Sequence, residues 1–241
     1  MTEEVETGVS AVMAAQMREG LARVAGPDVE EDVAAAREAG EALRRVIDRL
    51  TGTSAPPEVL REAVERLAPI DDLLRPYHAV RSYRGASETS LLGHDRAFFD
   101  WSPLFGLANP LAPPIRVAVE GEEVVGSVRF GIAYEGPPGC VHGGYIAATF
   151  DELLGMTQAL TGKRGMTGTL TIRYRRPTPL HRDLRWEGEV VREEGRKIFT
   201  TGRCLDGEQM TAEAEGTFVV VDFSRIEALY AQRAAWEAGR S

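Results

Sequence analysis

Residues 141–152 have the sequence Val-His-Gly-Gly-Tyr-Ile-Ala-Ala-Thr-Phe-Asp-Glu. The two glycines and the apolar run after them predict a helix from about Gly143 to Leu160, ending near Gly162. A helix start presents unpaired backbone N–H groups and the positive end of the helix dipole, and glycine lets a substrate approach those groups closely. Asp151 adds a carboxylate to this otherwise apolar helix. The stretch therefore has the features expected of a catalytic site.

The sequence around this helix predicts an antiparallel sheet. Apolar and polar residues alternate in several stretches, and glycines stand at turn positions between them, at Gly121, Gly195 and Gly207. The predicted strands are residues 115–119, 124–130, 166–175, 184–193, 197–205 and 211–221. One long helix followed by long strands predicts an α+β fold, with a sheet wrapped around a single helix. Residues 115–223 are therefore expected to form the main domain.

Residues 1–75 have a different composition, rich in Ala, Glu, Arg and Leu. Apolar residues recur at helical spacing on both sides of Pro56-Pro57, which breaks the helix (Leu43, Val46, Ile47 and Leu50 before it; Leu60, Val64 and Leu67 after it). We predict a helical extension with exposed charged faces, which packs on the main domain or binds a partner and carries no chemistry.

Two further segments flank the predicted domain. Residues 76–114 are irregular and rich in aromatic residues (Phe98, Phe99, Trp101 and Phe105), so they either cover a hydrophobic core or line a ligand tunnel. Residues 224–241 are expected to form a C-terminal helix, with Ser224 as N-cap and Glu227 as its capping-box partner. His78, His94 and His181 are interpreted as loop or surface residues.

The composition excludes several classes of function. The formal net charge of −9 and the pI of about 5.1 give no electrostatic support for nucleic-acid binding. Cys140 and Cys204 are too few for a disulfide framework or a cysteine-based zinc site, and no metal or cofactor is expected. No apolar run is long enough for a membrane span, and the acidic start is unlike a signal peptide, so we expect a cytoplasmic protein.

The spacing within the opening stretch predicts a site made by two chains. Asp151 follows Gly144 by seven residues, which corresponds to about 10 Å along a helix. Because of this separation, Asp151 cannot easily act on a group bound at the glycines of its own chain. A dimer that brings Asp151 of the partner subunit to the glycines removes the difficulty.

An ordered set of motifs gives a specific resemblance. Gly136-Pro137-Pro138-Gly139 precedes His142-Gly143-Gly144, Asp151 stands nine residues after the histidine, and the run from Thr167 to Pro177 and the turn from Gly195 to Phe199 follow. Over about residues 95–222 the chain resembles the PaaI-type acyl-CoA thioesterases of the hotdog-fold superfamily. The resemblance implies metal-free and cofactor-free hydrolysis of a medium- to long-chain fatty acyl-CoA. It also implies a homodimer with two composite sites and allows that dimer to stack into a dimer of dimers.

The resemblance also implies residue roles. The amides of Gly143 and Gly144 would polarise the thioester carbonyl and hold its oxyanion. His142 would orient the loop or contact the thioester, and Thr167 would help to hold the attacking water. Asp151 of the partner subunit would act as general base or nucleophile. Some family members carry Asn six residues before the histidine, where this chain has Gly136.

Substrate-binding candidates follow from position and charge. Tyr145, Phe150 and Met156 are expected to wall an acyl tunnel beside the helix, while Arg175 and Arg176 (with Arg173) either pair with the phosphates of coenzyme A or are surface charges.

Non-catalytic explanations of Asp151 and Thr167, and functions other than thioester hydrolysis, stay open at this point. Asp151 and Glu152 can form a solvated acidic pair, and Thr167 can be an ordinary strand residue. The rival functions are a hotdog acyl-thioester dehydratase and a non-catalytic acyl-CoA-binding or regulatory protein.

Overall fold

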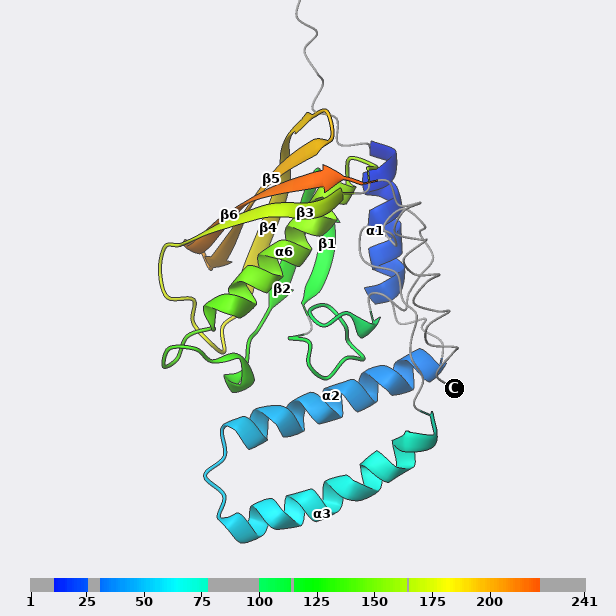
Figure 1. The fold of residues 1–241 in the computed structure, drawn as a ribbon, viewed down its shortest axis with the longest axis vertical. Coiled ribbons are helices and arrows are strands. Elements are labelled where there is room, and N and C mark those ends of the chain that lie inside the picture. Colours follow the sequence, from blue (N-terminus) through cyan, green and yellow to red (C-terminus); the bar gives the residue numbers. More distant parts are fainter. Residues whose placement is uncertain (1–10, 26–30, 78–99, 114, 164, 222–241) are drawn as a thin grey trace, which may run out of the picture.

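The computed structural model describes residues 11–25, 31–77, 100–113, 115–163 and 165–221. Six antiparallel strands form one sheet that wraps around a single long helix, α6 (Gly143–Ala159) (Figure 1). The strands are β1 (Arg116–Glu120), β2 (Glu123–Val128), β3 (Gly165–Tyr174), β4 (Leu184–Glu194), β5 (Lys197–Asp206) and β6 (Gln209–Val220). Their order across the sheet is β1-β2-β4-β5-β6-β3. The predicted α+β hotdog fold is confirmed.

Glycines with left-handed backbone conformations close the three hairpins. The φ angles are 63° at Gly121, 58° at Gly195 and 61° at Gly207. Side chains with a Cβ rarely adopt such values, so these positions fix where each strand pair turns. The hairpins join β1 to β2, β4 to β5 and β5 to β6.

The hydrophobic core lies between α6 and the concave face of the sheet. Its largest fully buried side chains include Trp186, Phe130, Phe150, Phe218, Leu153 and Leu154. Phe150 on α6 meets Trp186 on β4 edge-on, with ring centroids 4.8 Å apart. Gly188 and Gly202 stand opposite each other on β4 and β5, and a Cβ on either would collide with α6 or a neighbouring strand. These glycines let the helix approach the sheet closely.

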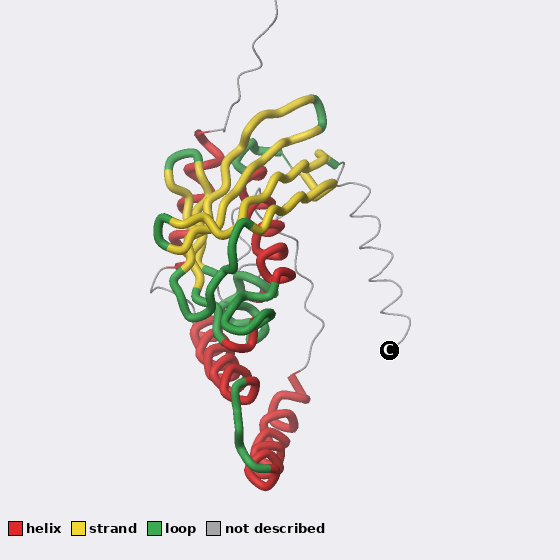
Figure 2. The backbone as a smooth tube through the Cα atoms, turned by 90° about the vertical axis from the view of Figure 1, so that its left-hand side faces the viewer, coloured by secondary structure: helices red, strands yellow, loops and turns green. Residues whose placement is uncertain are grey.

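Three helices form the N-terminal extension: α1 (Ala11–Ala25), α2 (Glu31–Thr51) and α3 (Pro57–Leu74), followed by the short 3-10 helix η1 (Arg75–Tyr77). α1 lies along the β1 edge of the sheet, where Arg18 donates hydrogen bonds of 3.2 Å to the carbonyls of Val119 and Gly121. α3 lies beyond α2, on the side away from the sheet, in both views (Figures 1 and 2).

Apolar and polar residues share the face of α2 that packs on the rest of the protein. Arg37 pairs with the buried Asp100 at 2.6 Å, and Arg44 donates to the carbonyls of Leu107 (2.8 Å) and Asn109 (2.9 Å). Gly40 lies against the same loop, since a Cβ there would come within 2.8 Å of two backbone carbonyls. Arg37 and Arg44 are therefore half-buried, whereas most charged residues of α2 are exposed (Glu31, Asp32, Glu38, Glu41, Arg45 and Arg49).

The predicted apolar side of α2 is only partly covered, and its Leu43 and Ile47 are half-buried. Val46 and Leu50 are 42% and 54% exposed. The expected C-terminal helix 224–241, together with His78, His94, Phe98 and Phe99 of the segment 76–114, lies outside the described residues. Within the described part of that segment, Phe105 belongs to the hydrophobic core.

Candidate active site

His142 caps the start of α6. Its backbone is extended (φ −60°, ψ 132°), and its Nδ1 accepts a hydrogen bond of 3.0 Å from the Gly144 N–H. The N–H groups of Tyr145 and Ile146 donate to the His142 carbonyl. Among the described residues, the N–H of Gly143 has no such partner, so it is the open donor of the first turn.

This cap distinguishes the two predicted oxyanion donors. The amide of Gly143 is available to a substrate, whereas that of Gly144 is occupied by the imidazole of His142. An Nδ1 that accepts a hydrogen bond carries no proton, so the neutral ring bears its proton on Nε2. Gly144 becomes a second donor only when the imidazole turns away.

The loop before the cap is tightly folded. The Gly136 N–H donates to the Cys140 carbonyl, and the Gly139 N–H donates to Oε1 of Glu135, over 2.9 and 2.6 Å. A Cβ on Gly136 would lie 2.7 Å from Cα of His142. The loop therefore requires glycine at position 136.

Asp151 is held by the edge strand of the sheet. Thr167 on β3 donates a hydrogen bond of 2.8 Å from its hydroxyl to Oδ1 of Asp151, which is half-buried. β3 carries a bulge here, because Thr167 pairs with Phe218 while Thr169 pairs with the next β6 residue, Thr217. Bulges commonly re-aim a side chain next to a functional site. The two residues predicted to act together are thus brought together.

Tyr174, at the far end of the same strand, contacts the other half of the site. Its hydroxyl donates a hydrogen bond of 2.9 Å to the carbonyl of Gly143. β3 therefore contacts α6 both at its first residue and two turns later. Sequence reasoning missed Tyr174, although its place at the end of an alternating strand is a usable signal.

Tyr134 packs against the start of α6. Its carbonyl accepts the His142 N–H at 2.9 Å, and its ring meets the Tyr145 ring edge-on with centroids 4.8 Å apart. Burial raises the pKa of Tyr134 to about 12, so its hydroxyl stays protonated and donates to the Leu111 carbonyl. Sequence reasoning also missed this residue, since nothing in the η2 turn (Ile132–Tyr134) marks it.

A solved crystal structure of a thioesterase superfamily protein is 35% identical to this chain, with a TM-score of 0.66. The match covers 76% of this chain and 94% of the other. The chain belongs to the thioesterase superfamily. The family model of that superfamily matches residues 138–213, which include the glycines, Asp151 and Thr167. The 76% coverage is more than residues 115–223 alone can supply, so this superfamily member shares part of its extension with the solved protein.

Two curated relatives of this superfamily member are acyl-coenzyme A thioesterases by name. THEM4 of Xenopus laevis is 37% identical over 87 residues, which are 35% of this chain and 39% of the relative. THEM5 of Homo sapiens is 32% identical over 87 residues, which are 35% of each chain. The matched part thus spans about two fifths of these relatives or less.

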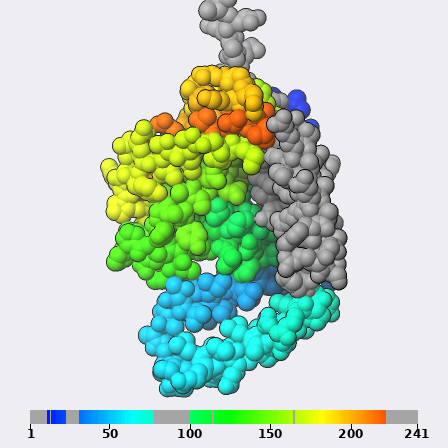
Figure 3. All heavy atoms as spheres, viewed as in Figure 1, coloured from blue at the N-terminus to red at the C-terminus, as the bar shows by residue number. Residues whose placement is uncertain are grey.

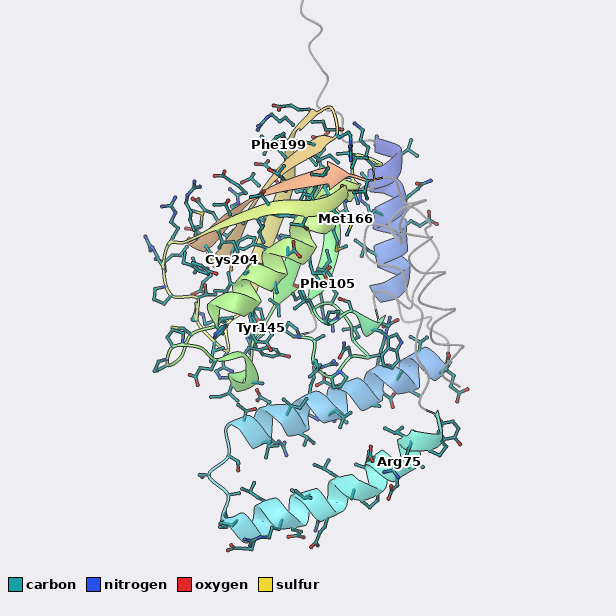
Figure 4. The ribbon with its side chains drawn as sticks, viewed as in Figure 1. Arg75, Phe105, Tyr145, Met166, Phe199 and Cys204 are labelled. Carbon is teal, nitrogen blue, oxygen red and sulfur yellow. The ribbon has the colours of Figure 1, made fainter. Side chains whose placement is uncertain are left out.

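The three predicted tunnel residues of this superfamily member differ in exposure. Phe150 and Met156 are 0% and 2% exposed and belong to the core. Tyr145 is half-buried and lies at the end of α6 that faces α2 (Figure 4). Of the three, Tyr145 is the one that solvent reaches.

Arg173 of β3 and Arg175, which follows the strand, form ion pairs on the sheet surface. Because Tyr174 points toward α6, its neighbours Arg173 and Arg175 point to the opposite face. There Arg175 donates to Glu213 (Nε to Oε1, 3.1 Å) and Arg173 donates to Glu215 (2.6 Å). Arg176 lines an open hollow of about 760 Å³ together with Asp206 and Glu208.

Glu152 is the second carboxylate beside the site. It is half-buried, and its pKa is raised to about 7, first by burial and then by the charge of Asp151. In the part of this superfamily member that the structure describes, no group of three or more His, Cys, Asp or Glu side chains is arranged to hold a metal ion. None of the described helices has the length and apolar character needed to cross a membrane.

Proposed function

We propose that the protein hydrolyses the thioester of a medium- to long-chain fatty acyl-CoA to the free acid and coenzyme A. The observation that carries the proposal is the hydrogen bond between Thr167 and Oδ1 of Asp151. It holds a carboxylate in one orientation, on a helix whose first amide is open, in a member of the thioesterase superfamily. The names of the curated relatives supply the substrate class.

The proposed reaction uses water as the nucleophile. Asp151 takes a proton from a water held with the help of Thr167, and the water oxygen bonds to the thioester carbon. The oxyanion is stabilised by the Gly143 N–H, and by Gly144 once His142 releases it; one such donor is typically worth about 3–4 kcal/mol. The C–S bond then breaks, and the thiolate of coenzyme A takes the proton from Asp151. Direct attack by the carboxylate of Asp151 on the carbonyl is the alternative first step.

The proposed site combines two chains. Gly143 and Asp151 are eight residues apart in α6, or about 12 Å along its axis. β3 ends the sheet, and it has exposed residues along most of its length, including Met166 and Tyr174. An unpaired strand edge favours pairing with another chain. In the proposed homodimer, Asp151 of the partner subunit serves the glycines of the first, and two such dimers can stack.

The acyl chain is proposed to run along α6 from Tyr145. Phe150 and Met156 reach that path only when the core around them opens, so they are proposed as the inner limit on chain length. A role in fatty acid metabolism and a cytoplasmic location complete the proposal.

A thiol-release assay over a series of saturated acyl-CoAs tests the function. The wild type should release coenzyme A with a preference among C8 to C18 chains, and Asp151→Asn should lower kcat by about 10³-fold. Light scattering should give at least a dimer. Tight binding without release, unchanged in Asp151→Asn, would instead support an acyl-CoA-binding protein, and hydration of a 2-enoyl-CoA would support the dehydratase. A monomer with full activity would contradict the composite site.

A further inference from the structure

A cavity of about 350 Å³ lies between α2 and the chain that leads to the glycines. Its apolar wall includes Ile47 and Tyr134, and its rim carries Arg49 of α2 and Arg129, which follows β2. We call it the α2 cavity. α2 runs past the end of α6 at which the glycines lie, so the cavity and the proposed oxyanion site are on the same side of the protein (Figures 1 and 3).

The rim arginines are available to an anion. Arg49 makes no hydrogen bond or ion pair with any other described residue. Arg129 donates two hydrogen bonds, of 2.9 and 2.8 Å, to Asp183, and both side chains are mostly exposed. An exposed ion pair contributes little stability, so a phosphate can replace Asp183 at low cost. The planar guanidinium of arginine suits phosphate oxygens.

The acidic residues of the cavity do not cancel this charge. Glu41 is paired with Arg44 and Arg45 at 3.1 and 3.4 Å. Asp48 packs against Gly131, where a Cβ would come within 2.3 Å of its Oδ1. A carboxylate there can accept hydrogen bonds from the amino or hydroxyl groups of a ligand. The cavity thus combines an aromatic wall, an acceptor and a cationic rim.

Tyr134 contacts both the cavity and the start of α6. Tyr134 lines the cavity, its ring touches Tyr145, and its carbonyl holds the His142 N–H. The arginines at the end of β3 are placed differently, since Arg175 points to the face of the sheet opposite α6 and is paired with Glu213. The α2 cavity is therefore the better placed of the two for a group covalently joined to a thioester at Gly143.

We propose that the α2 cavity binds the adenosine 3′,5′-bisphosphate end of coenzyme A. The inference rests on the proposed function, because it concerns the leaving group of the same reaction. Tyr134 and Ile47 pack against the adenine, Asp48 accepts from its amino group or the ribose, and Arg49 and Arg129 bind the phosphates. The pantetheine arm then reaches past Tyr145 to the helix start. α2 becomes a part of the substrate site.

Two substrates with the same acyl group separate this proposal from the proposed function. Decanoyl-CoA carries the nucleotide, whereas decanoyl-N-acetylcysteamine has the same thioester without it. Arg49→Ala and Arg129→Ala should each raise KM for decanoyl-CoA about tenfold, the loss expected for one charge-assisted hydrogen bond, and leave KM for decanoyl-N-acetylcysteamine unchanged. Arg66→Ala, which removes an exposed pair with Glu62 on α3, is the matched control and should change neither value.

Calorimetry with adenosine 3′,5′-bisphosphate tests the site without turnover. The wild type should bind it, and the double variant Arg49→Ala/Arg129→Ala should bind at least tenfold more weakly. If Arg49→Ala and Arg129→Ala hydrolyse both substrates and change the two KM values equally, the nucleotide site is wrong and the proposed thioesterase activity still holds. Selective KM effects from Arg175→Ala or Arg176→Ala, with none from Arg49 or Arg129, would do the same. Binding of the bisphosphate by the wild type without any hydrolysis would refute the proposed function alone.

Discussion

The hydroxyl of Thr167 lies 2.8 Å from Oδ1 of Asp151 and donates a hydrogen bond to it. This contact joins the edge strand to the central helix beyond its first two turns. It orients one carboxylate oxygen, while the second, Oδ2, makes no hydrogen bond to the described residues. A carboxylate held in this way has one oxygen fixed and one free to take a proton from water.

The first prediction concerns this contact. Thr167→Val removes the hydroxyl and keeps the shape, so kcat for acyl-CoA should fall about 10-fold to 100-fold with little change in Tm, as expected for a hydrogen bond to a charged group. Thr167→Ser should retain most of the activity. Thr169→Val, on the other side of the bulge, is the control. Full activity in Thr167→Val would show that the Thr167 hydroxyl has no role in catalysis.

The second prediction concerns Gly136. Gly136→Ala should lower stability by about 1–3 kcal/mol and lower kcat, because the new Cβ would meet backbone at Cα of His142 and displace the cap of α6. Urea unfolding and thiol release measure the two effects. Gly20→Ala in α1, where nothing lies within 4 Å, should instead stabilise by up to about 1 kcal/mol. A stable and fully active Gly136→Ala would show that the loop adapts.

The third prediction concerns the pH dependence of stability. The pKa of Glu152 is about 7 in the folded protein against an ordinary value of 4.5, so folding favours its protonated form. The resulting stabilisation is complete below about pH 4.5 and is lost as the pH rises through 7. Glu152→Gln should therefore be more stable than the wild type at pH 8 by about 1–3 kcal/mol and nearly equal to it at pH 4.5.

Urea unfolding at these two pH values tests this expectation. Asp71→Asn on α3, which replaces an exposed carboxylate, is the control and should show no comparable change between the two pH values. A difference between wild type and Glu152→Gln that stays the same at both would argue against titration of Glu152.

The fourth prediction concerns Gln158, near the end of α6. Its side chain is fully buried, and neither its amide nitrogen nor its amide oxygen has a hydrogen-bond partner. A buried polar group without partners costs stability, so Gln158→Met should stabilise the protein by about 1–2 kcal/mol in thermal unfolding. A lower Tm in this variant would mean that the assembled protein supplies a partner for the amide.

Much of the domain was predictable from the sequence. The turn glycines at 121, 195 and 207 and the alternation between them place the strands within about two residues of their observed ends. The helix from Gly143 was also predictable, because two glycines followed by a long apolar run are typical of a buried helix and its start. The pairing of Asp151 with Thr167 followed from family spacing.

The remainder depends on features that periodicity does not reveal. The docking of α2 uses arginines that bond to loop carbonyls, and backbone carbonyls leave no mark in the sequence. The occupation of the Gly144 amide by His142 depends on a side-chain rotamer. The role of Tyr134 arises from contacts across the fold, which its local sequence does not encode.

The bulge at Gly168 changes the face of the sheet to which the side chains of β3 point. Thr167 and Tyr174 are seven residues apart, and in a regular strand an odd separation places two side chains on opposite faces. Both nevertheless contact α6, because the bulge adds one residue to β3 without adding one to β6. In a strand without this extra residue, the side chain of either Thr167 or Tyr174 would point toward α6, but not both. The inserted glycine therefore lets a single strand hold the acid and the start of the helix at once.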